Sequence, residues 1–237
     1  MNFSVALRAD TRRCKIAGIA RTNGESDGES DARTPRGGLS GSCAAPGLRD
    51  QMGIGSIAPG RRAVFLDRDG VLNRAIVRDG KPYPPNSVDA LEILPGVPDA
   101  LADLKAAGFL LLVITNQPDV AKGIQSREAV EAIHRRLRAE LPLDDILVCY
   151  HQDEDACHCR KPAPGLLQEA AARHALYLPF CFMVGDRWRD VDAGCRAGCR
   201  TILLDYGYRE QLPENEPAAR VSSLREAADW ILACATL

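Results

Sequence analysis

Val64-Phe65-Leu66-Asp67-Arg68-Asp69-Gly70 is the most informative segment of the chain, because an apolar run ends there in two carboxylates. Residues two apart in an extended chain point to the same side, so Asp67 and Asp69 can face one ligand. Gly70 permits a sharp turn that sets the second carboxylate at a different height from the first. One carboxylate can then attack phosphorus while the other protonates the leaving oxygen, its pKa raised by its neighbour and by partial burial. The alternative is an Asp- and Gly-rich turn of the kind that is common at strand ends.

After residue 61 the chain alternates short apolar runs with segments of helical periodicity. The runs predict strands at Ala63–Leu66, Leu110–Thr115, Ile146–Tyr150, Cys181–Val184 and Thr201–Leu204. The periodic segments predict helices at Val97–Ala107, Arg127–Leu141, Gly165–Ala175, Arg189–Ala197 and Leu224–Ala233. His134 and His174 fall in two of these amphipathic helices and are predicted to be half-exposed. Because unbroken Val/Ile/Leu strands are usually covered on both faces, the pattern predicts an α/β fold, a doubly wound parallel sheet with its ligand at the carboxyl ends of the strands.

Composition excludes several classes of protein. The chain has 237 residues, of which 46% are hydrophobic, enough for a sizeable core. Its 30 Lys and Arg against 32 Asp and Glu give no global basic field of the kind that nucleic-acid binding usually needs. The apolar runs fall far short of the roughly 18 residues that a membrane span requires, and the N-terminus lacks the apolar core of a secretory signal. We therefore expect a cytoplasmic monomer that binds neither nucleic acid nor membrane.

Residues 1–60 differ in composition from the rest of the chain. Residues 21–50 are rich in Gly, Ser, Arg and Asp and contain almost no large apolar residues. Such a segment cannot bury enough surface to offset its ordering entropy, so residues 1–60 are predicted to be a disordered N-terminal extension and 61–237 the folded domain. A targeting leader or a partner-binding arm is the alternative, although acidic residues such as Asp10 and Glu25 argue against a transit peptide. A translation start at Met52 is a further alternative.

Polar side chains also follow three other predicted strands. Thr115 and Asn116 place a hydroxyl and an amide where phosphate oxygens would sit. Asp186 can hold Mg²⁺, a hard cation that prefers carboxylates and water and is usually bound together with phosphate. Lys161 can neutralise charge on a phosphoryl group, and the neighbouring Arg160 can form a forked contact with the substrate. Together with the first pair of carboxylates, these strand ends favour a phosphoryl-transfer site over isolated surface residues.

Three of the nine cysteines cluster at Cys149, Cys157 and Cys159, with His151 and His158 beside them. A disulfide framework is typical of small secreted proteins, so the cluster indicates a metal instead. Three thiolates and one imidazole suit tetrahedral Zn²⁺ and leave no open position, which predicts a structural site in a small zinc-binding loop. The spacing allows either histidine to be the fourth ligand. A reduced, Cys-rich loop without metal is the alternative.

Four segments together resemble the haloacid dehalogenase superfamily of phosphohydrolases. They are DRDGVLN (67–73), TNQPDVAKG (115–123), CHCRKPAPG (157–165) and GDRWRDVDAG (185–194). Within the superfamily they are most similar to the branch of heptose bisphosphate and histidinol phosphatases, and the resemblance covers roughly residues 62–208. It implies the Rossmann-like fold of that superfamily, a phosphatase activity and Mg²⁺ as the catalytic cofactor, with Zn²⁺ as a structural ion.

The resemblance also implies a role for each matching residue. Asp67 would be the nucleophile and Asp69 the general acid/base. The residues that would hold the phosphoryl group are Thr115 and Lys161. The Mg²⁺ ligands would be the Asp67 carboxylate, the Asp69 backbone carbonyl and Asp186. The residues that would contact the substrate are Asn116, Arg160 and Arg187. The Zn²⁺ ligands would be Cys149, His151, Cys157 and Cys159.

Spacing and departures from the family pattern bear on the substrate. Only 45 residues, 70–114, separate the first two motifs, which leaves no room for a large cap domain, and residues 73–87 are predicted to form an irregular loop over the site. The chain departs from relatives at Arg187, where many carry Lys, at Pro118-Asp119, where many carry a small residue and Gly, and at Tyr150, where many carry Pro.

An open site of this kind suits a small phosphorylated sugar. The resemblance favours removal of the 7-phosphate of D-glycero-D-manno-heptose 1,7-bisphosphate through an aspartyl-phosphate. Histidinol phosphate is the alternative substrate, because the metal loop is short. A zinc-braced binding module without turnover is a third hypothesis, against which the complete set of motif residues argues.

Overall fold

The computed structural model describes residues 61–235, so the predicted disorder of residues 1–60 lies outside the described residues. Six strands form one parallel sheet in the order β5-β4-β1-β6-β7-β8. They are β1 (Ala63–Leu66), β4 (Leu110–Asn116), β5 (Asp145–Cys149), β6 (Phe182–Gly185), β7 (Arg200–Leu204) and β8 (Ala219–Val221). The predicted parallel sheet is confirmed, and only β8, a short edge strand, has no counterpart in the prediction.

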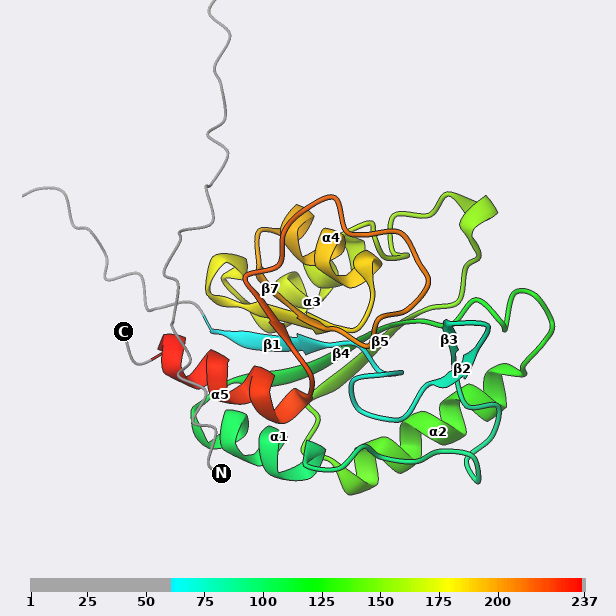
Figure 1. Ribbon diagram of the computed structural model, residues 1–237, viewed down its shortest axis with the longest axis horizontal. Helices are drawn as coiled ribbons and strands as arrows, with labels where there is room; N and C mark the ends of the chain where they lie inside the picture. The colour runs from blue at the N-terminus through cyan, green and yellow to red at the C-terminus, as the bar shows by residue number, and fades with distance from the viewer. Residues whose placement is uncertain (1–60, 236–237) are drawn as a thin grey trace, which may run out of the picture. The chain divides into compact units, whose positions relative to one another are not determined.

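Helices cover both faces of the sheet. They are α1 (Val97–Ala106), α2 (Arg127–Glu140), α3 (Gly165–His174), α4 (Trp188–Ala197) and α5 (Leu224–Ala235), with short 3₁₀ turns η1 (Asp153–Asp155) and η2 (Leu178–Phe180). Helices α1, α2 and α5 lie on one face, and α3 and α4 lie on the other (Figure 1). The doubly wound arrangement is therefore confirmed.

Strand β1 shows why the apolar runs have no polar alternation. Val64 and Leu66 pack into the core on one face of the sheet, whereas Ala63 and Phe65 pack into the core on the other, and all four are fully buried. Leu66 pairs with Val113 of β4 and with a residue of β6, so β1 lies in the middle of the sheet. The strand order changes direction beside β1, which is where α/β sheets bind ligands.

The segment after β1 contains an unexpected hairpin. The prediction of an irregular loop over residues 73–87 is wrong in part, because β2 (Ile76–Arg78) and β3 (Lys81–Tyr83) form an antiparallel pair. Asp79 and Gly80 join them with φ of 51° and 75°. Two positive φ values are what a type I′ turn requires, and Asp-Gly is its common sequence. The hairpin was therefore visible in the sequence as this dipeptide.

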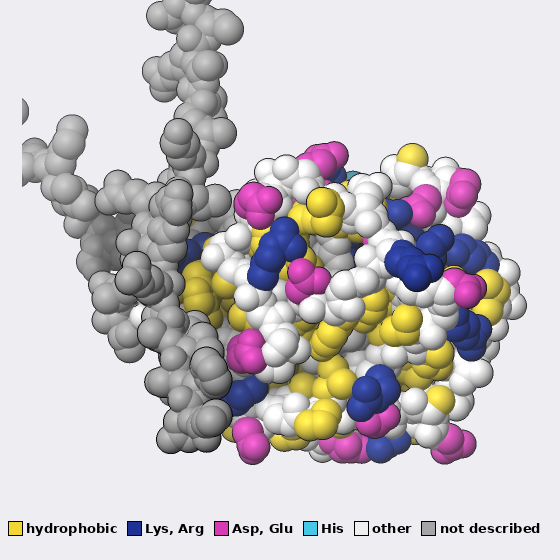
Figure 2. Space-filling view, in the orientation of Figure 1, with side chains coloured by type: hydrophobic (Ala, Val, Ile, Leu, Met, Phe, Trp, Pro, Cys, Tyr) yellow, Lys and Arg dark blue, Asp and Glu magenta, His cyan; other side chains and the backbone are white. Residues whose placement is uncertain are grey.

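The described residues contain no separate cap domain, as predicted from the spacing. Between β1 and β4 they hold the β2–β3 hairpin, α1 and connecting loops. No helix within residues 61–235 is long and apolar enough to cross a membrane. Charged side chains of both signs are interspersed on the face shown in Figure 2, with Lys and Arg side chains grouped toward the end of the sheet where β2 and β3 lie.

Candidate active site

A pocket of about 230 Å³ lies at the carboxyl ends of β1 and β4. Six of its lining residues are cationic: Lys81, Lys122, Arg160, Lys161, Arg187 and Arg189. Six are acidic: Asp67, Asp69, Asp119, Asp153, Asp190 and Glu210. The pocket therefore offers positive charge for an anion and carboxylates for chemistry or a cation. Of the predicted site residues, all those with a catalytic or substrate role except Thr115 line it.

Lys161 is the central cation of the site. Its Nζ atom lies 2.8 Å from Asp67 Oδ1 and 2.6 Å from Asp190 Oδ1, and it donates a hydrogen bond of 2.7 Å to the carbonyl of Ile114. Burial opposes the charge of this side chain, but the two carboxylates outweigh burial and raise the pKa of Lys161. Lys161 is therefore a fixed positive charge beside Asp67. Asp190 belongs to the segment GDRWRDVDAG, but no role was predicted for it.

Three carboxylates crowd around this cation. Oxygen atoms of Asp67, Asp186 and Asp190 all lie within 4.8 Å of one another, and all three side chains are buried. Burial raises the pKa of Asp67 to about 6, with Lys161 opposing the rise and Asp190 adding to it. Burial likewise raises the pKa of Asp186, and the neighbouring Asp67 and Asp190 carboxylates raise it further. One lysine does not balance three carboxylates, so a further cation would stabilise their ionised forms.

Asp186 has the properties of a ligand for that cation. Among residues 61–235, neither of its carboxylate oxygens accepts a hydrogen bond of normal geometry, although the Tyr208 hydroxyl lies close enough to lower its pKa slightly. A Cβ atom at Gly70 would lie 1.9 Å from Asp186 Oδ2, so only glycine lets the turn after β1 approach this carboxylate. Buried oxygens without partners are rare, and hard oxygen ligands suit Mg²⁺. The donor set therefore fits a divalent cation.

Asp69 lies in the opposite electrostatic situation. Its Oδ1 accepts hydrogen bonds from Arg68 Nε (3.1 Å) and Asn73 Nδ2 (3.0 Å). Its Oδ2 accepts from Arg68 Nη2 and from Gln117 Nε2, both at 2.8 Å. Burial would raise the pKa of Asp69, but the charge and hydrogen bonds of Arg68 outweigh it, helped by Asn73 and Gln117, and the pKa is lowered. The predicted rise in the pKa of Asp69 is therefore wrong for this arrangement.

His134 is a second correction. It is 3% exposed rather than half-exposed, and its Nε2 lies 3.0 Å from Arg68 Nη1. Burial, helped by the charge of Arg68, lowers the pKa of His134 to about 4. The helical period predicted half-exposure because it could not show that a buried arginine 66 residues away lies opposite. His174 is partly buried against Asp145, at 3.2 Å.

Asn116 and Thr115 support the site from the end of β4. Asn116 Oδ1 accepts a hydrogen bond from the backbone N–H of Lys161 (3.1 Å), and its Nδ2 donates to the Lys161 carbonyl (3.0 Å). Asn116 therefore fixes the backbone that carries the central cation, besides lining the pocket. Thr115 is 1% exposed, and its hydroxyl accepts a hydrogen bond of 3.0 Å from Gln117.

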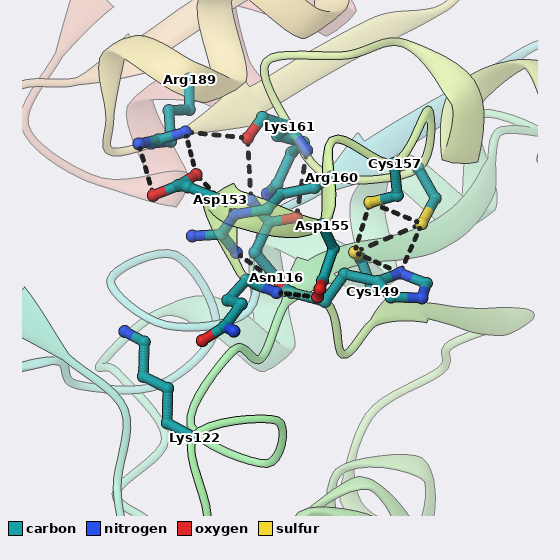
Figure 3. A network of polar contacts seen from close by, with 12 residues as sticks. Asn116, Lys122, Cys149, Asp153, Asp155, Cys157, Arg160, Lys161 and Arg189 are labelled. Atoms are coloured by element: carbon teal, nitrogen blue, oxygen red, sulfur yellow. Dashed lines mark hydrogen bonds and ion pairs between the residues drawn. The ribbon is translucent and has the colours of Figure 1, made fainter.

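The predicted substrate residues Arg160 and Arg187 are each held by a carboxylate. Arg160 Nε donates to Asp153 Oδ1 at 2.8 Å, and Arg189 Nη1 contacts the same oxygen at 3.1 Å, so Asp153 lies between the two arginines (Figure 3). Arg187 forms a bidentate pair with Glu210. These acidic partners hold the guanidinium groups at the pocket wall. Sequence spacing offered no signal for Asp153, Arg189 or Glu210.

The metal-loop residues Cys149, His151, Cys157 and Cys159 come together as one cluster, and all three cysteines are free thiols. The Sγ–Sγ distances are 3.7, 3.3 and 3.4 Å, and His151 Nδ1 lies 3.6 and 3.3 Å from two of the sulfurs (Figure 3). Zn–S bonds of about 2.3 Å and a Zn–N bond of about 2.0 Å place tetrahedral ligand atoms about 3.5–3.8 Å apart. The cluster therefore has nearly the dimensions of a zinc site, and it contains His151 rather than His158.

Comparisons with known proteins agree with this geometry. Residues 64–189 match the family model of polynucleotide kinase 3 phosphatase, and residues 158–227 match the HAD-hydrolase-like family. A D-glycero-beta-D-manno-heptose-1,7-bisphosphate 7-phosphatase of Helicobacter pylori is 33% identical over 72% of this chain and 97% of its own length. The enzyme of that name from Escherichia coli K12 is 32% identical over 72% of this chain and 87% of its own.

A solved structure of a heptose bisphosphate phosphatase is also similar to this chain. The D,D-heptose 1,7-bisphosphate phosphatase of B. bronchiseptica, complexed with magnesium and phosphate, aligns with a TM-score of 0.62 and 32% identity. The alignment covers 73% of this chain and 98% of that one. Sequence, fold and relatives thus converge, and the chain belongs to the haloacid dehalogenase superfamily, as a phosphatase of the branch that contains the heptose 1,7-bisphosphate 7-phosphatases.

Proposed function

We propose that the chain is a Mg²⁺-dependent phosphomonoesterase that works through an aspartyl-phosphate on Asp67. Its proposed substrate is D-glycero-D-manno-heptose 1,7-bisphosphate, from which it removes the 7-phosphate. The observation that carries the proposal is the buried Lys161 ammonium, 2.8 Å from the carboxylate of Asp67 at the wall of a polar pocket. A carboxylate beside a fixed cation can approach a phosphate dianion that it would otherwise repel.

The reaction has two displacements. In the first, an oxygen of Asp67 forms a bond to phosphorus as the ester P–O bond breaks, and Asp69 gives a proton to the departing sugar oxygen. In the second, Asp69 takes a proton from water, whose oxygen attacks the phosphorus of the aspartyl-phosphate. Inorganic phosphate leaves and the carboxylate of Asp67 is regenerated. Lys161 and Thr115 hold the phosphoryl group. The negative charge of the phosphoryl group raises the pKa of the nearby Asp69 and so favours the protonated form that the first step needs.

The proposed Mg²⁺ ligands are the carboxylates of Asp67 and Asp186 with the backbone carbonyl of Asp69. The buried oxygens of Asp186, which accept no hydrogen bond of normal geometry within residues 61–235, support this assignment. When bound, the ion would neutralise charge that develops on the phosphoryl oxygens. It would also balance the excess of carboxylates over lysine in this part of the site.

The substrate assignment rests on the relatives and on the cationic pocket wall. Asn116, Arg160 and Arg187 are proposed to contact the sugar phosphate, with Arg189 as an additional cation beside Asp153. The relatives named as heptose 1,7-bisphosphate 7-phosphatases favour the bisphosphate over histidinol phosphate, and cationic side chains at the pocket wall can pair with phosphoryl oxygens.

A panel of phosphate esters tests the substrate. We expect kcat/KM for the heptose bisphosphate to exceed that for histidinol phosphate by at least about 100-fold, because the smaller ligand would lose the contacts that Asn116, Arg160 and Arg187 are proposed to make with the sugar phosphate. Phosphate release should be measured with and without added Mg²⁺, omitting the ion rather than adding a chelator so that the zinc loop is not disturbed. A strong preference for histidinol phosphate would overturn the substrate assignment.

The cysteine cluster is proposed to hold one structural Zn²⁺. We expect about one equivalent of zinc in the purified protein, and well under half an equivalent after Cys157→Ser, because the tetrahedral site would lose one of its four ligands. The same change should lower Tm by at least about 5 °C. Cys234→Ser, which alters a cysteine on α5 outside the cluster, is the matched control and should retain the metal. Wild-type protein without zinc would contradict the assignment.

A further inference from the structure

Arg68 is an unusual residue, because its side chain is fully buried and forms an ion pair with the carboxylate of Asp69. A buried guanidinium costs several kcal/mol unless its donors are satisfied. Its Nε and Nη2 atoms both donate to the carboxylate of Asp69, and its Nη1 atom lies 3.0 Å from Nε2 of His134. The guanidinium thus has carboxylate oxygens on one edge and an imidazole nitrogen on the other.

The hydrogen bond to His134 fixes the form of the imidazole. Arginine has only donors, so Nε2 of His134 must accept, and the ring is neutral with its proton on Nδ1. That Nδ1 atom faces Glu131 at 3.7 Å on the same helix, and Glu131 accepts a hydrogen bond from the hydroxyl of Tyr150. A chain of polar side chains thus runs from Tyr150 through Glu131 and His134 to Arg68.

The geometry also fixes the orientation of Asp69. Each of its two oxygens accepts two hydrogen bonds, and Arg68 supplies one to each oxygen. A planar fork of two parallel N–H groups sets the plane of a carboxylate, whereas single donors such as Asn73 and Gln117 do not. The position of the Asp69 carboxylate thus depends on the guanidinium plane, which in turn depends on the acceptor at His134.

We propose that Arg68, held in place by His134, is the positioning residue of the general acid/base Asp69. This inference rests on the role proposed above for Asp69. On this view, Arg68 and His134 touch neither substrate nor metal, and they act by keeping the acid at the distance and angle that proton transfer requires. Glu131 completes the support by facing the other ring nitrogen of His134, and the Tyr150 hydroxyl donates to Glu131.

The leaving group of the substrate distinguishes this role from a merely structural one. A departing sugar alkoxide is a strong base and needs a proton from Asp69, whereas p-nitrophenolate is a weak base that leaves without one. The ratio kcat/KM covers the steps up to formation of the aspartyl-phosphate. A change that misplaces the acid should therefore lower kcat/KM for a sugar phosphate far more than for p-nitrophenyl phosphate. A change that only unfolds or loosens the protein should lower both alike.

Four variants carry the experiment. Asp69→Asn is the reference for loss of the acid. Arg68→Lys keeps the charge but removes the fork, and His134→Phe keeps a ring but removes the acceptor. His134→Gln retains an acceptor and should rescue. We expect Arg68→Lys and His134→Phe to lower kcat/KM for the sugar phosphate about 10- to 100-fold, with less than about a threefold effect on p-nitrophenyl phosphate. His134→Gln, and His174→Gln as a control on α3 that does not line the pocket, should stay within about threefold on both substrates.

The outcomes separate the two levels of the proposal. If Asp69→Asn lowers kcat/KM equally for the sugar phosphate and for p-nitrophenyl phosphate, Asp69 is not the acid and the proposed mechanism fails. If Asp69→Asn discriminates between the substrates but Arg68→Lys and His134→Phe do not, the positioning role alone is overturned. Should His134→Phe fail to fold by circular dichroism, Arg68→Lys still decides, because it retains the buried charge. If His134→Gln shows the same selective loss as His134→Phe, the hydrogen bond that His134 accepts from Arg68 does not hold Arg68 in place, and that part of the proposal is overturned.

Discussion

Asp67→Asn is expected to abolish turnover, with kcat lowered at least about 10⁴-fold, because loss of the nucleophile removes the covalent route. The amide of Asn keeps the volume of the carboxylate but cannot form an acyl phosphate that is hydrolysed in the second step. Single-turnover experiments with ³²P-labelled substrate should show a labelled, base-sensitive wild-type protein and no label on the variant. Asp99→Asn, an exposed change at the start of α1, is the matched control and should retain full activity.

The stability of the same variant separates chemistry from folding. Asp67, Asp186 and Asp190 share one buried lysine, so removal of one charge lowers the repulsion among them. We therefore expect the free energy of unfolding of Asp67→Asn, measured in urea at pH 7 without Mg²⁺, to equal or exceed that of the wild type. Residual activity near the wild-type level would refute the proposed nucleophile. A large loss of stability would instead show that Asp67 has a structural role.

Lys161→Met should damage both activity and stability. Its ammonium lies within 2.8 Å of two carboxylates and is 2% exposed, so methionine would fill the space but leave Asp67 and Asp190 buried without their cation. We expect kcat to fall at least about 100-fold, as when one stabiliser of transition-state charge is removed. The free energy of unfolding should fall by about 3–5 kcal/mol, the usual cost of breaking a buried ion pair from one side.

A double-mutant cycle tests the cause of that loss. Adding Asp190→Asn to Lys161→Met removes one stranded carboxylate and should recover at least about 1 kcal/mol of stability, while activity stays low. Lys122→Met is the control, because Lys122 lines the same pocket but forms a weaker ion pair. Its side chain is 45% exposed, and its Nζ atom lies 3.9 Å from Asp119 Oδ1. Its stability should change by less than about 0.5 kcal/mol. A fully additive cycle would show that Lys161 and Asp190 do not stabilise each other.

The fold was predictable because its strands are buried on both faces. An unbroken apolar run such as residues 110–115 is stable in a small α/β domain only where both of its faces are buried, in the middle of the sheet. Its predicted limits differ from those of β4 by one residue. The errors concern short elements. Strand β8 has only three residues, none fully buried, so it lacks an apolar signal. The β2–β3 hairpin also lacks one, and its Asp-Gly turn was the only indication of it.

The site was predictable only where chemistry coincides with a strand end. Asp67 and Asp186 come together because parallel strands bring their carboxyl ends to one edge of the sheet, and the loop after β5 carries Lys161 to the same edge. Contacts that depend on where a long side chain turns were not predictable. The fork of Arg68 onto Asp69, and its contact with a histidine on α2, follow from packing that no local period records.

The absence of a cap domain from the described residues bears on which step limits the rate of turnover. Many phosphate-processing enzymes must close over their substrate and reopen, and that motion sets their rate. Here the walls of the pocket come from a packed sheet, a two-stranded hairpin and the cysteine-rich loop, so no large body within residues 61–235 has to move. Water, which the second displacement consumes, can enter without a conformational step. On the proposed mechanism, the rate of turnover is then set by bond formation at phosphorus or by diffusion of substrate and product through the pocket mouth. Higher solvent viscosity would slow substrate binding and product release, with no cap-closing step to slow.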